Sequence, residues 1–362
     1  NYVKKEISPI IEDYAQRAEF PQQIVKQMGE LGVFGPTIPE QYGGGGLDYI
    51  SYGLMMQELE RGDSGVRSTA SVQGSLVMFP IYQYGSEEQR NKYLPKLASG
   101  EWLGCFGLTE PNHGSDPSSM LTNIKDAGDH VILNGAKMWI SNAPFSQVAG
   151  VWAKDEAGDI RGLVVERGME GFSTPTTHGK WSLRASATGE LVFDNVKVPK
   201  ENIFPNVKGL KGPLGCLTKA RYGIAWGAVG AAMDCYHIAL EYSKERIQFG
   251  KPIGGFQLQQ KKLAEMVTEI TKAQLLNWRL GVLMNEGKVT PQQVSMAKRN
   301  ACEIASNICR DARQMLGGMG ITGEYPVMRH MMNLESVITY EGTHDIHLLI
   351  TGMDVTGMNA FK

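Results

Sequence analysis

Apolar residues recur every three or four positions in the first hundred residues of the chain, which is the spacing of a helix with one buried face. Ile24, Met28 and Leu31 follow this spacing, and a second helix is predicted over residues 48–60, after a run of four glycines that interrupts the pattern. The stretch 64–75 is rich in Ser, Gly and Ala, which suit close packing of backbones. The N-terminal part of the chain is therefore predicted to be helical.

The spacing changes to two between about residues 102 and 199, where β-branched and aromatic residues lie between Gly, Asn and Asp turns. This period is typical of strands. The strongest segment is Val131–Ile140, in which Asn134-Gly135 fits a two-residue hairpin turn because both residues tolerate positive φ. Further strands are predicted over residues 148–153, 162–166 and 190–196.

Helical spacing returns after Pro205, where two long helices are predicted. The second begins with Thr290 as its cap and Pro291 in its first turn, and it ends at Gly317-Gly318, where glycine tolerates the left-handed closing conformation. With the small-residue stretch 222–239 and the C-terminal segment, these helices predict a four-helix bundle. The apolar stripe of the first helix is Leu263, Val267, Ile270, Ala273, Leu276, Leu280 and Leu283, and that of the second is Val294, Ala297, Ala301, Ile304, Ile308, Ala312 and Met315.

Together these patterns predict an α+β fold with three domains. A helical domain is placed at residues 1–104, a β domain of barrel-like or sandwich-like form at 105–205, and a helical bundle at 206–362. The length agrees with this division, because 362 residues exceed what one hydrophobic core usually organises. Two or three cores in contact are expected.

Composition excludes several classes of function. The formal net charge is -2 and no clustered basic footprint occurs, so neither nucleic acid nor an anionic membrane is an expected partner. No apolar run reaches the length of a bilayer span, and no signal-peptide pattern follows Asn1. The five cysteines are scattered and odd in number, which favours reduced thiols over a disulfide framework.

Two motifs suggest chemistry by themselves, but their context argues against both. The glycines of 318–323 match the G-x-G-x-x-G of dinucleotide-binding folds, yet a long helix precedes them where that fingerprint needs a strand. The segment with Glu341, His344, Asp345 and His347 could form a metal cluster, since positions three apart share a helix face. No cysteine or further histidine pair lies nearby to complete it, so no metal site is predicted.

Four other motifs are informative because they occur together. They are Leu108–Asp116 (LTEPNHGSD), Lys137–Asn142 (KMWISN), Arg246–Gly250 (RIQFG) and Gln314–Gly318 (QMLGG). In this order, and across nearly the whole chain, they make the sequence similar to the acyl-CoA dehydrogenase family. The helix, β, helix layout predicted from periodicity agrees with the fold of that family.

The resemblance implies an FAD cofactor. Backbone and hydroxyl groups near Thr109 and Ser141 would hydrogen-bond the flavin ring, and Trp139 would cover it. Arg246 and its neighbours in the last two motifs would contact the FAD of an adjacent subunit, although Arg246 alone could also pair with a nearby glutamate. The implied cofactor residues are Phe106, Leu108, Thr109, Gly114, Ser115, Trp139, Ile140, Ser141, Arg246, Phe249, Gln257, Gln314, Leu316, Gly317, Gly318, Thr343 and Asp345.

Within the family, Thr339–His347 and Gly179–Ser186 are similar to the branch that acts on glutaryl-CoA. Arg67 fits this branch, because it stands among Ser, Thr, Gly, Ala and Val, where a buried cation needs an anionic partner. That partner is either a substrate carboxylate or a carboxylate of the chain, Glu60 or Asp63. The implied substrate-binding residues are Arg67, Ser68, Ser71, Glu60, Ser115, Leu214, Arg221, Tyr340 and Gly342.

The resemblance also implies a reaction. Glu341 would be the base that removes a proton next to the thioester of glutaryl-CoA, and dehydrogenation followed by decarboxylation would give crotonyl-CoA and CO2. Electrons would pass to an electron-transfer flavoprotein, from a homotetramer built as a dimer of dimers. A bacterial protein would be cytoplasmic, and a eukaryotic one would lie in the mitochondrial matrix.

Two alternatives stay open at this point. A short-chain acyl-CoA dehydrogenase or an acyl-CoA oxidase of the same fold would carry very similar flavin motifs. A helical scaffold that keeps the fold without a flavin is an alternative from another class.

Overall fold

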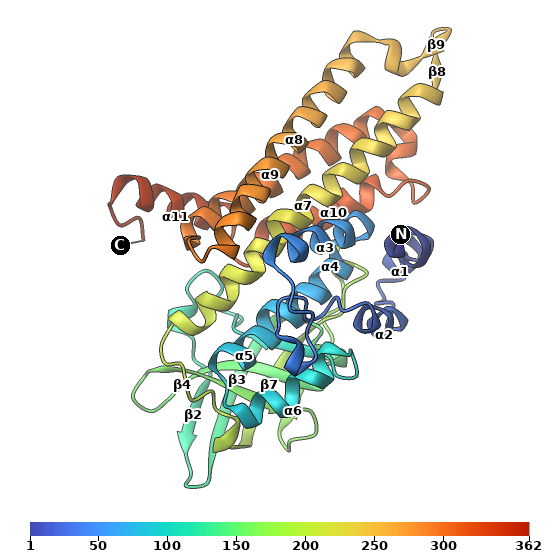
Figure 1. Cartoon of the computed structure of the whole chain (residues 1–362). Coiled ribbons are helices and arrows are strands. Elements are labelled where there is room, and N and C mark those ends of the chain that lie inside the picture. The colour runs from blue at the N-terminus through green and yellow to red at the C-terminus, as the bar shows by residue number, and fades with distance from the viewer. Residues whose placement is uncertain (362) are drawn as a thin grey trace.

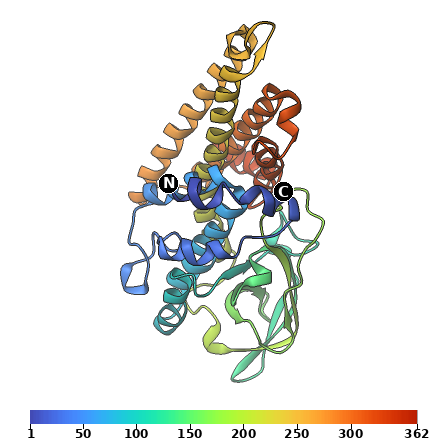
Figure 2. The ribbon, with the colours of Figure 1, turned by 90° about the vertical axis from the view of Figure 1, so that its right-hand side faces the viewer.

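The computed structural model describes residues 1–361 and confirms the predicted order of helices, strands and helices. Figure 1 shows the C-terminal helices as an elongated bundle at one end of the molecule and the sheet at the other. In the perpendicular view of Figure 2, the N-terminal helices again lie between these two parts. The N-terminal helices therefore lie beside both the sheet and the bundle, which also meet each other where residues 182–183 contact α10.

Six α-helices form the N-terminal part. The predicted helix over 48–60 is confirmed as α3, capped by Asp48, whose side chain accepts a hydrogen bond from Ser51 N at 2.7 Å. The small-residue stretch forms α4 and a buried π-helical continuation, Val72–Met78. The six helices are α1 (Ile11–Arg17), α2 (Gln23–Glu30), α3 (Tyr49–Gly62), α4 (Ser64–Ser71), α5 (Phe79–Tyr84) and α6 (Glu87–Ala98).

The β domain is one seven-stranded sheet in which β4 also pairs with β5. Its path runs β1-β4-β2-β3-β7-β6, with a parallel β1–β4 pair and a long antiparallel β3–β7 pair. The three further strands predicted from the sequence are confirmed as β4, β5 and β7. The strands are β1 (Gly104–Gly107), β2 (Asn123–Asp126), β3 (His130–Ser141), β4 (Val148–Lys154), β5 (Ile160–Glu166), β6 (Phe172–Ser173) and β7 (Thr188–Pro199).

The hairpin turn predicted at Asn134-Gly135 is wrong. β3 runs through these residues, and the hairpin with β2 closes earlier, where Ala127 N donates to His130 O at 3.0 Å. Gly135 instead lies at a register shift of the β3–β7 pair with φ 136°. A side chain there would collide with Thr122, so glycine serves a bulge and a close backbone approach, which the dipeptide signal cannot distinguish from a turn.

Four long helices pack as the predicted bundle, and a fifth, α11, packs on α9 (Figure 1). Thr290 caps α9 in a capping box, and Gly317 follows the helix with φ 59°, as predicted. The stripe on α8 is partly wrong, because Val267 is 41% exposed whereas Met266 is buried. The elements are α7 (Lys211–Glu245), α8 (Gln257–Asn285), α9 (Pro291–Met315), α10 (Val327–Thr339) and α11 (His344–Thr356), with the short strands β8 (Ile247–Gln248) and β9 (Lys251–Pro252) between α7 and α8.

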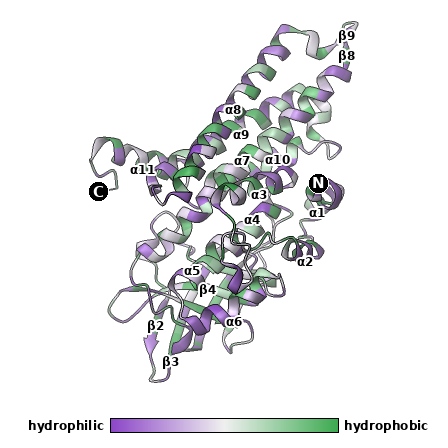
Figure 3. Ribbon diagram, viewed as in Figure 1, coloured by the Kyte–Doolittle hydropathy of each residue, from purple (hydrophilic) through white to green (hydrophobic). Residues whose placement is uncertain are grey.

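Residues 1–361 contain two hydrophobic cores. One is shared by the N-terminal helices, the C-terminal helices and the face of the sheet that carries Trp152, and the other lies around Leu133, Val151 and Phe193 of the sheet. Figure 3 shows hydrophobic residues where helices meet and hydrophilic residues on their outer faces. Among residues 1–361, no helix has the length and hydrophobicity that crossing a membrane requires. We propose the domain boundaries 1–104, 105–205 and 206–362, which agree with the separate core of the sheet.

Candidate active site

A cavity of about 1950 Å³ lies between the sheet, the start of α7 and the segment that joins α10 to α11. Ligand pockets usually measure roughly 300–1,000 Å³, so this cavity has room for two ligands. Fifteen of the predicted site residues line it: Ser68, Phe106, Leu108, Thr109, Gly114, Ser115, Trp139, Ile140, Ser141, Leu214, Arg221, Tyr340, Glu341, Gly342 and Thr343.

Glu341 lies in a tight turn between α10 and α11. Its φ is 54° and that of Gly342 is 98°, so both residues are left-handed. The carboxylate oxygen Oε2 is buried without a hydrogen-bond partner among residues 1–361. Burial raises the pKa of Glu341 to about 7, against the opposing charges of Arg67, Arg221 and Lys298. A carboxylate with this pKa accepts a proton readily at neutral pH.

Arg67 lies in a buried polar cluster directly behind the cavity. Its Nε donates to Glu60 Oε2 at 2.5 Å, and one of its terminal nitrogens donates to the hydroxyl of Tyr340, which lines the cavity. Burial alone would lower the pKa of Arg67, but the charges of Glu60 and Tyr340 hold it above its usual range. Of the two carboxylates that the sequence offered as partners, Glu60 pairs with Arg67.

The wall of the cavity on the sheet side depends on a bulge in β3. The β3–β7 register shifts between Lys137 and Ile140, and Trp139 takes a φ of 63°. Its indole is 56% exposed and faces the cavity. Lys137 belongs to the KMWISN motif, but the sequence assigned it no role. It is fully buried and donates to Glu110 Oε1 at 2.8 Å and to Leu108 O at 3.0 Å. The bulge therefore turns an aromatic ring toward the cavity while a buried ion pair fixes its neighbours.

The remaining predicted cofactor residues do not line this cavity. Most lie at the opposite end of the bundle, where α7 ends, α8 begins and α9 ends (Figure 1). The 35 residues of α7 span about 50 Å, which separates this end from the cavity of the same chain. Phe249 is 95% exposed there, and Gln314 accepts a hydrogen bond from Lys262. The residues are Arg246, Phe249, Gln257, Gln314, Leu316, Gly317 and Gly318, and Asp345 lies exposed in the first turn of α11.

The structure shows the surroundings of the glycine motif at 318–323 and of the histidine-containing segment at 341–347. Residues 318–323 follow α9, and Gly317–Ile321 forms a 3-10 helix, so the setting of the glycines is not a strand-to-helix turn. Among residues 1–361 no group of three His, Cys, Asp or Glu side chains could hold a metal ion. His347 is fully buried, and this burial lowers its pKa to about 3, so it is neutral. It packs against Gly342 beside the Glu341 turn.

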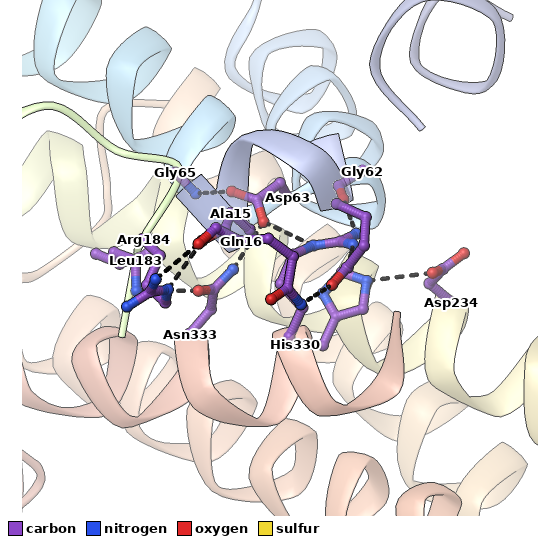
Figure 4. A network of polar contacts seen from close by, with 12 residues as sticks. Ala15, Gln16, Gly62, Asp63, Gly65, Leu183, Arg184, Asp234, His330 and Asn333 are labelled. Carbon is purple, nitrogen blue, oxygen red and sulfur yellow. Dashed lines mark hydrogen bonds and ion pairs between the residues drawn. The ribbon is translucent and has the colours of Figure 1, made fainter. Parts of the chain in front are cut away.

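A buried network around Asp63 joins the helices that surround the cavity (Figure 4). Asp63 caps α4 by accepting from Gly65 N at 2.7 Å, and it also accepts from Arg329 Nε at 3.1 Å and Asn333 Nδ2 at 2.8 Å on α10. Asn333 in turn accepts from Leu183 N, which lies in the cavity wall. Asp63 thereby connects the helix that carries Arg67 with the helix that leads to Glu341.

Asp63→Ala is expected to lower the free energy of unfolding by about 3 to 5 kcal/mol, since it leaves the buried Arg329 with fewer acceptors and removes the cap of α4. Urea unfolding measures this directly. Glu19→Ala, which breaks the exposed pair with Arg17, is the control and should cost about 1 kcal/mol or less. Equal losses in both variants would contradict a structural role for the network.

Comparisons with known proteins agree with this architecture over nearly the whole chain. Three family models match, described as the N-terminal, middle and C-terminal domains of acyl-CoA dehydrogenase, at residues 1–101, 105–196 and 208–356. The chain is 40% identical to a glutaryl-CoA dehydrogenase of Desulfococcus multivorans, over 99% of this chain and 94% of that protein.

Two solved structures extend the comparison. A glutaryl-CoA dehydrogenase from Mycobacterium smegmatis in complex with FADH2 has a TM-score of 0.98 and 48% identity, covering 100% of this chain and 93% of that one. A chain in the structure of the electron transferring flavoprotein of Acidaminococcus fermentans has a TM-score of 0.95 and 37% identity, covering 98% of this chain and 95% of that one.

Proposed function

This chain belongs to the acyl-CoA dehydrogenase family, and we propose that it uses FAD to oxidise glutaryl-CoA and releases the distal carboxylate as CO2, which leaves crotonyl-CoA. One observation carries this proposal: Glu341, whose buried Oε2 has no hydrogen-bond partner among residues 1–361, lines the cavity beside Tyr340, and the buried Arg67 donates to the hydroxyl of Tyr340. The similarity to enzymes named glutaryl-CoA dehydrogenase supports this choice of substrate.

The residues of the sheet wall fit a flavin. Trp139 offers an aromatic face, Thr109 and Ser141 offer hydroxyl groups, and the cavity is large enough for a cofactor and a thioester together. FAD, when bound, supplies the acceptor for the hydride that leaves the β carbon of the substrate. The chain itself must then bind the thioester, exclude water and remove the α proton.

Glu341 is proposed to take that proton. Its carboxylate is desolvated, which strengthens it as a base, and its backbone N–H polarises the thioester oxygen as negative charge develops there. Arg221, at the wall near Leu214, supplies the ionic contact to the CoA part. Gly342 and Thr343 close the cavity around the reacting carbons.

Arg67 is proposed to bind the distal carboxylate of glutaryl-CoA. Two of its three nitrogens are engaged by Glu60 and Tyr340, with Ser68 and Ser71 on the same short helix. After α,β-oxidation the distal carboxylate leaves as CO2, because the conjugated thioester accepts its electron pair. Glu341 then returns its proton to the γ carbon, which gives crotonyl-CoA.

One assay tests this function. Glutaryl-CoA labelled in the distal carboxylate and butyryl-CoA are each supplied with an artificial electron acceptor, and released CO2 is counted. We expect labelled CO2 and a preference for glutaryl-CoA. Preference for butyryl-CoA would favour a short-chain dehydrogenase, peroxide formation an oxidase, and a colourless protein that takes up no FAD a scaffold.

We also propose that an electron-transfer flavoprotein accepts the electrons and that the chain forms a homotetramer. The flavoprotein structure among the solved relatives supports the first point. The exposed Arg246 and Phe249, far from the cavity of their own chain, support the second, because they would complete the FAD site of a neighbour. We place a bacterial protein in the cytoplasm and a eukaryotic one in the mitochondrial matrix.

A mixing experiment tests the shared site. Arg246→Ala should weaken FAD binding and Glu341→Gln should abolish turnover, so each variant alone is inactive. Co-expressed, they should recover about a quarter of wild-type activity, since half of randomly formed pairs are mixed and each mixed pair holds one complete site. An active, FAD-loaded monomer in sedimentation, or no recovery on mixing, would refute the proposal.

A further inference from the structure

Three consecutive backbone carbonyls at the Glu341 turn are held by two buried cations. Lys298 Nζ donates to Tyr340 O and Gly342 O, each at 3.0 Å, and Arg221 Nε donates to Glu341 O at 2.6 Å. Lys298 comes from α9 and Arg221 from α7, so the turn is held from two different helices.

The conformation of this turn needs such support. A left-handed non-glycine residue costs roughly 1 to 3 kcal/mol and persists only where its surroundings enforce it. Glu341 has this conformation, and Gly342 beside it could not carry a side chain, because a Cβ would lie 2.9 Å from His347 Nε2. Relaxation of the turn would move both the carboxylate and the backbone N–H of Glu341.

The number of N–H donors on Lys298 equals the number of carbonyl oxygens that the turn presents to it. Its side chain is 1% exposed, and a third carbonyl, Ile338 O, lies at 3.4 Å. The three N–H donors of an ammonium group thus face three carbonyl oxygens, whereas a neutral amine would offer only two donors. A lysine that only capped the C-terminus of α10 would donate to the carbonyls of Ile338 and Tyr340. Lys298 also donates to the carbonyl of Gly342, which lies beyond Glu341.

The charge of Lys298 also acts on Glu341. Burial lowers the pKa of Lys298, and the positive charges of Arg221 on α7 and Arg67 on α4 lower it further. Cys302 and Glu341 act in the opposite direction and raise this pKa. His347 of α11 and Tyr340 complete the titratable groups around it. The positive charge of Lys298 in turn lowers the pKa of Glu341.

We propose that Lys298 is a positioning residue for Glu341: it holds the carbonyls of Tyr340 and Gly342 on either side of the left-handed Glu341 and keeps the base aimed at the substrate, an inference that rests on the proposed role of Glu341. Arg221 supports the same turn from the other side.

Lys298→Met tests this proposal, since it keeps the apolar stem and removes donors and charge. We expect kcat with glutaryl-CoA to fall about a hundredfold, the scale of a small misplacement of a reacting group, with little change in KM. The acidic limb of the kcat/KM profile should move to higher pH, because loss of a positive charge raises the pKa of Glu341. Hydrogen exchange at the amides of 340–343 should accelerate.

Two further variants separate positioning from general stability. Lys298→Arg retains the charge and should keep the acidic limb at its wild-type pH. Cys302 lies one turn along α9 on the same buried face, and its thiol donates to Val337 O. Burial raises the pKa of Cys302 to about 11, so Cys302→Ala removes no charge near neutral pH and should change neither the pH profile nor exchange in the turn.

The proposal is overturned if Lys298→Met shows a wild-type acidic limb and wild-type exchange at the turn, or if Cys302→Ala reproduces its effects. Should Lys298→Met fail to fold, Lys298→Arg decides: a shifted limb in that variant overturns the proposal, and an unshifted limb with a protected turn supports it. Exchange is measurable even in a protein that oxidises no glutaryl-CoA, so the failure of this inference is distinguishable from the failure of the proposed function.

Discussion

Glu341→Gln is expected to lower turnover of glutaryl-CoA by at least about a hundredfold while FAD remains bound. Glutamine has the shape of the carboxylate and fits the same left-handed turn, but its amide cannot accept the α proton. The Oε2 of Glu341 is buried and accepts no hydrogen bond from residues 1–361, so this oxygen is available to accept the proton. Stopped-flow measurement of flavin reduction isolates the step, and reduction at the wild-type rate would remove Glu341 from the mechanism.

The same variant gives a stability signature that does not depend on activity. Burial raises the pKa of Glu341 from 4.5 to about 7, so the folded state binds its proton more tightly than the unfolded state does. The resulting stability is present below pH 4.5 and is lost as the pH rises through about 7. Glu341→Gln should therefore raise the melting temperature at pH 8 relative to wild type, and do so less at pH 5. An unchanged difference between these pH values would argue against a buried carboxylate.

In the wild-type enzyme, the loss of activity at acidic pH should be governed by the protonation of Glu341. The base works as a carboxylate, so kcat/KM should rise with pH through about 7 in the free enzyme. Lys298, Arg221 and Arg67 each lower this pKa, and burial raises it. The pH profile thus reports the balance between burial and three cations.

Elements with a strong local signal were predictable from the sequence. The α9 cap at Thr290 and the strands of the β domain depend on period, caps and β-branched residues, which act over a few positions. The motif residues at 106–115 and 139–141 were also expected together, and the structure brings them to one cavity. The domain boundaries and the roles of these residues stay proposals.

Features that depend on contacts between distant segments were not predictable. Asp63 and Arg329 are 266 positions apart, and Lys298 meets Tyr340 from another helix, so no local spacing indicates either pair. At Gly135 a local signal gave a wrong prediction. The Asn-Gly pair favours a turn, and only the contact with Thr122 shows that the glycine serves a bulge. The pairing of Arg67 with Glu60 needed their burial, which the sequence does not give.

Arg67→Met is expected to reduce kcat/KM for glutaryl-CoA by about two to four powers of ten more than for butyryl-CoA. A buried charge that loses its partner costs about 3 to 5 kcal/mol, and each 1.4 kcal/mol is tenfold. Butyryl-CoA has no distal carboxylate to lose a partner, so its turnover should suffer only from disturbance of the pocket. Both specificity constants are measured on wild type and variant.

Glu60 complicates this experiment, because Arg67→Met leaves it buried without its cation at the 2.5 Å pair. The double variant Glu60→Gln/Arg67→Met removes both charges and with them the unpaired carboxylate. If Arg67 binds the substrate, the double variant should recover stability and butyryl-CoA turnover but keep its selective loss with glutaryl-CoA. If Arg67 serves only to neutralise Glu60, the double variant should recover both substrates alike, and the reason for naming glutaryl-CoA would disappear.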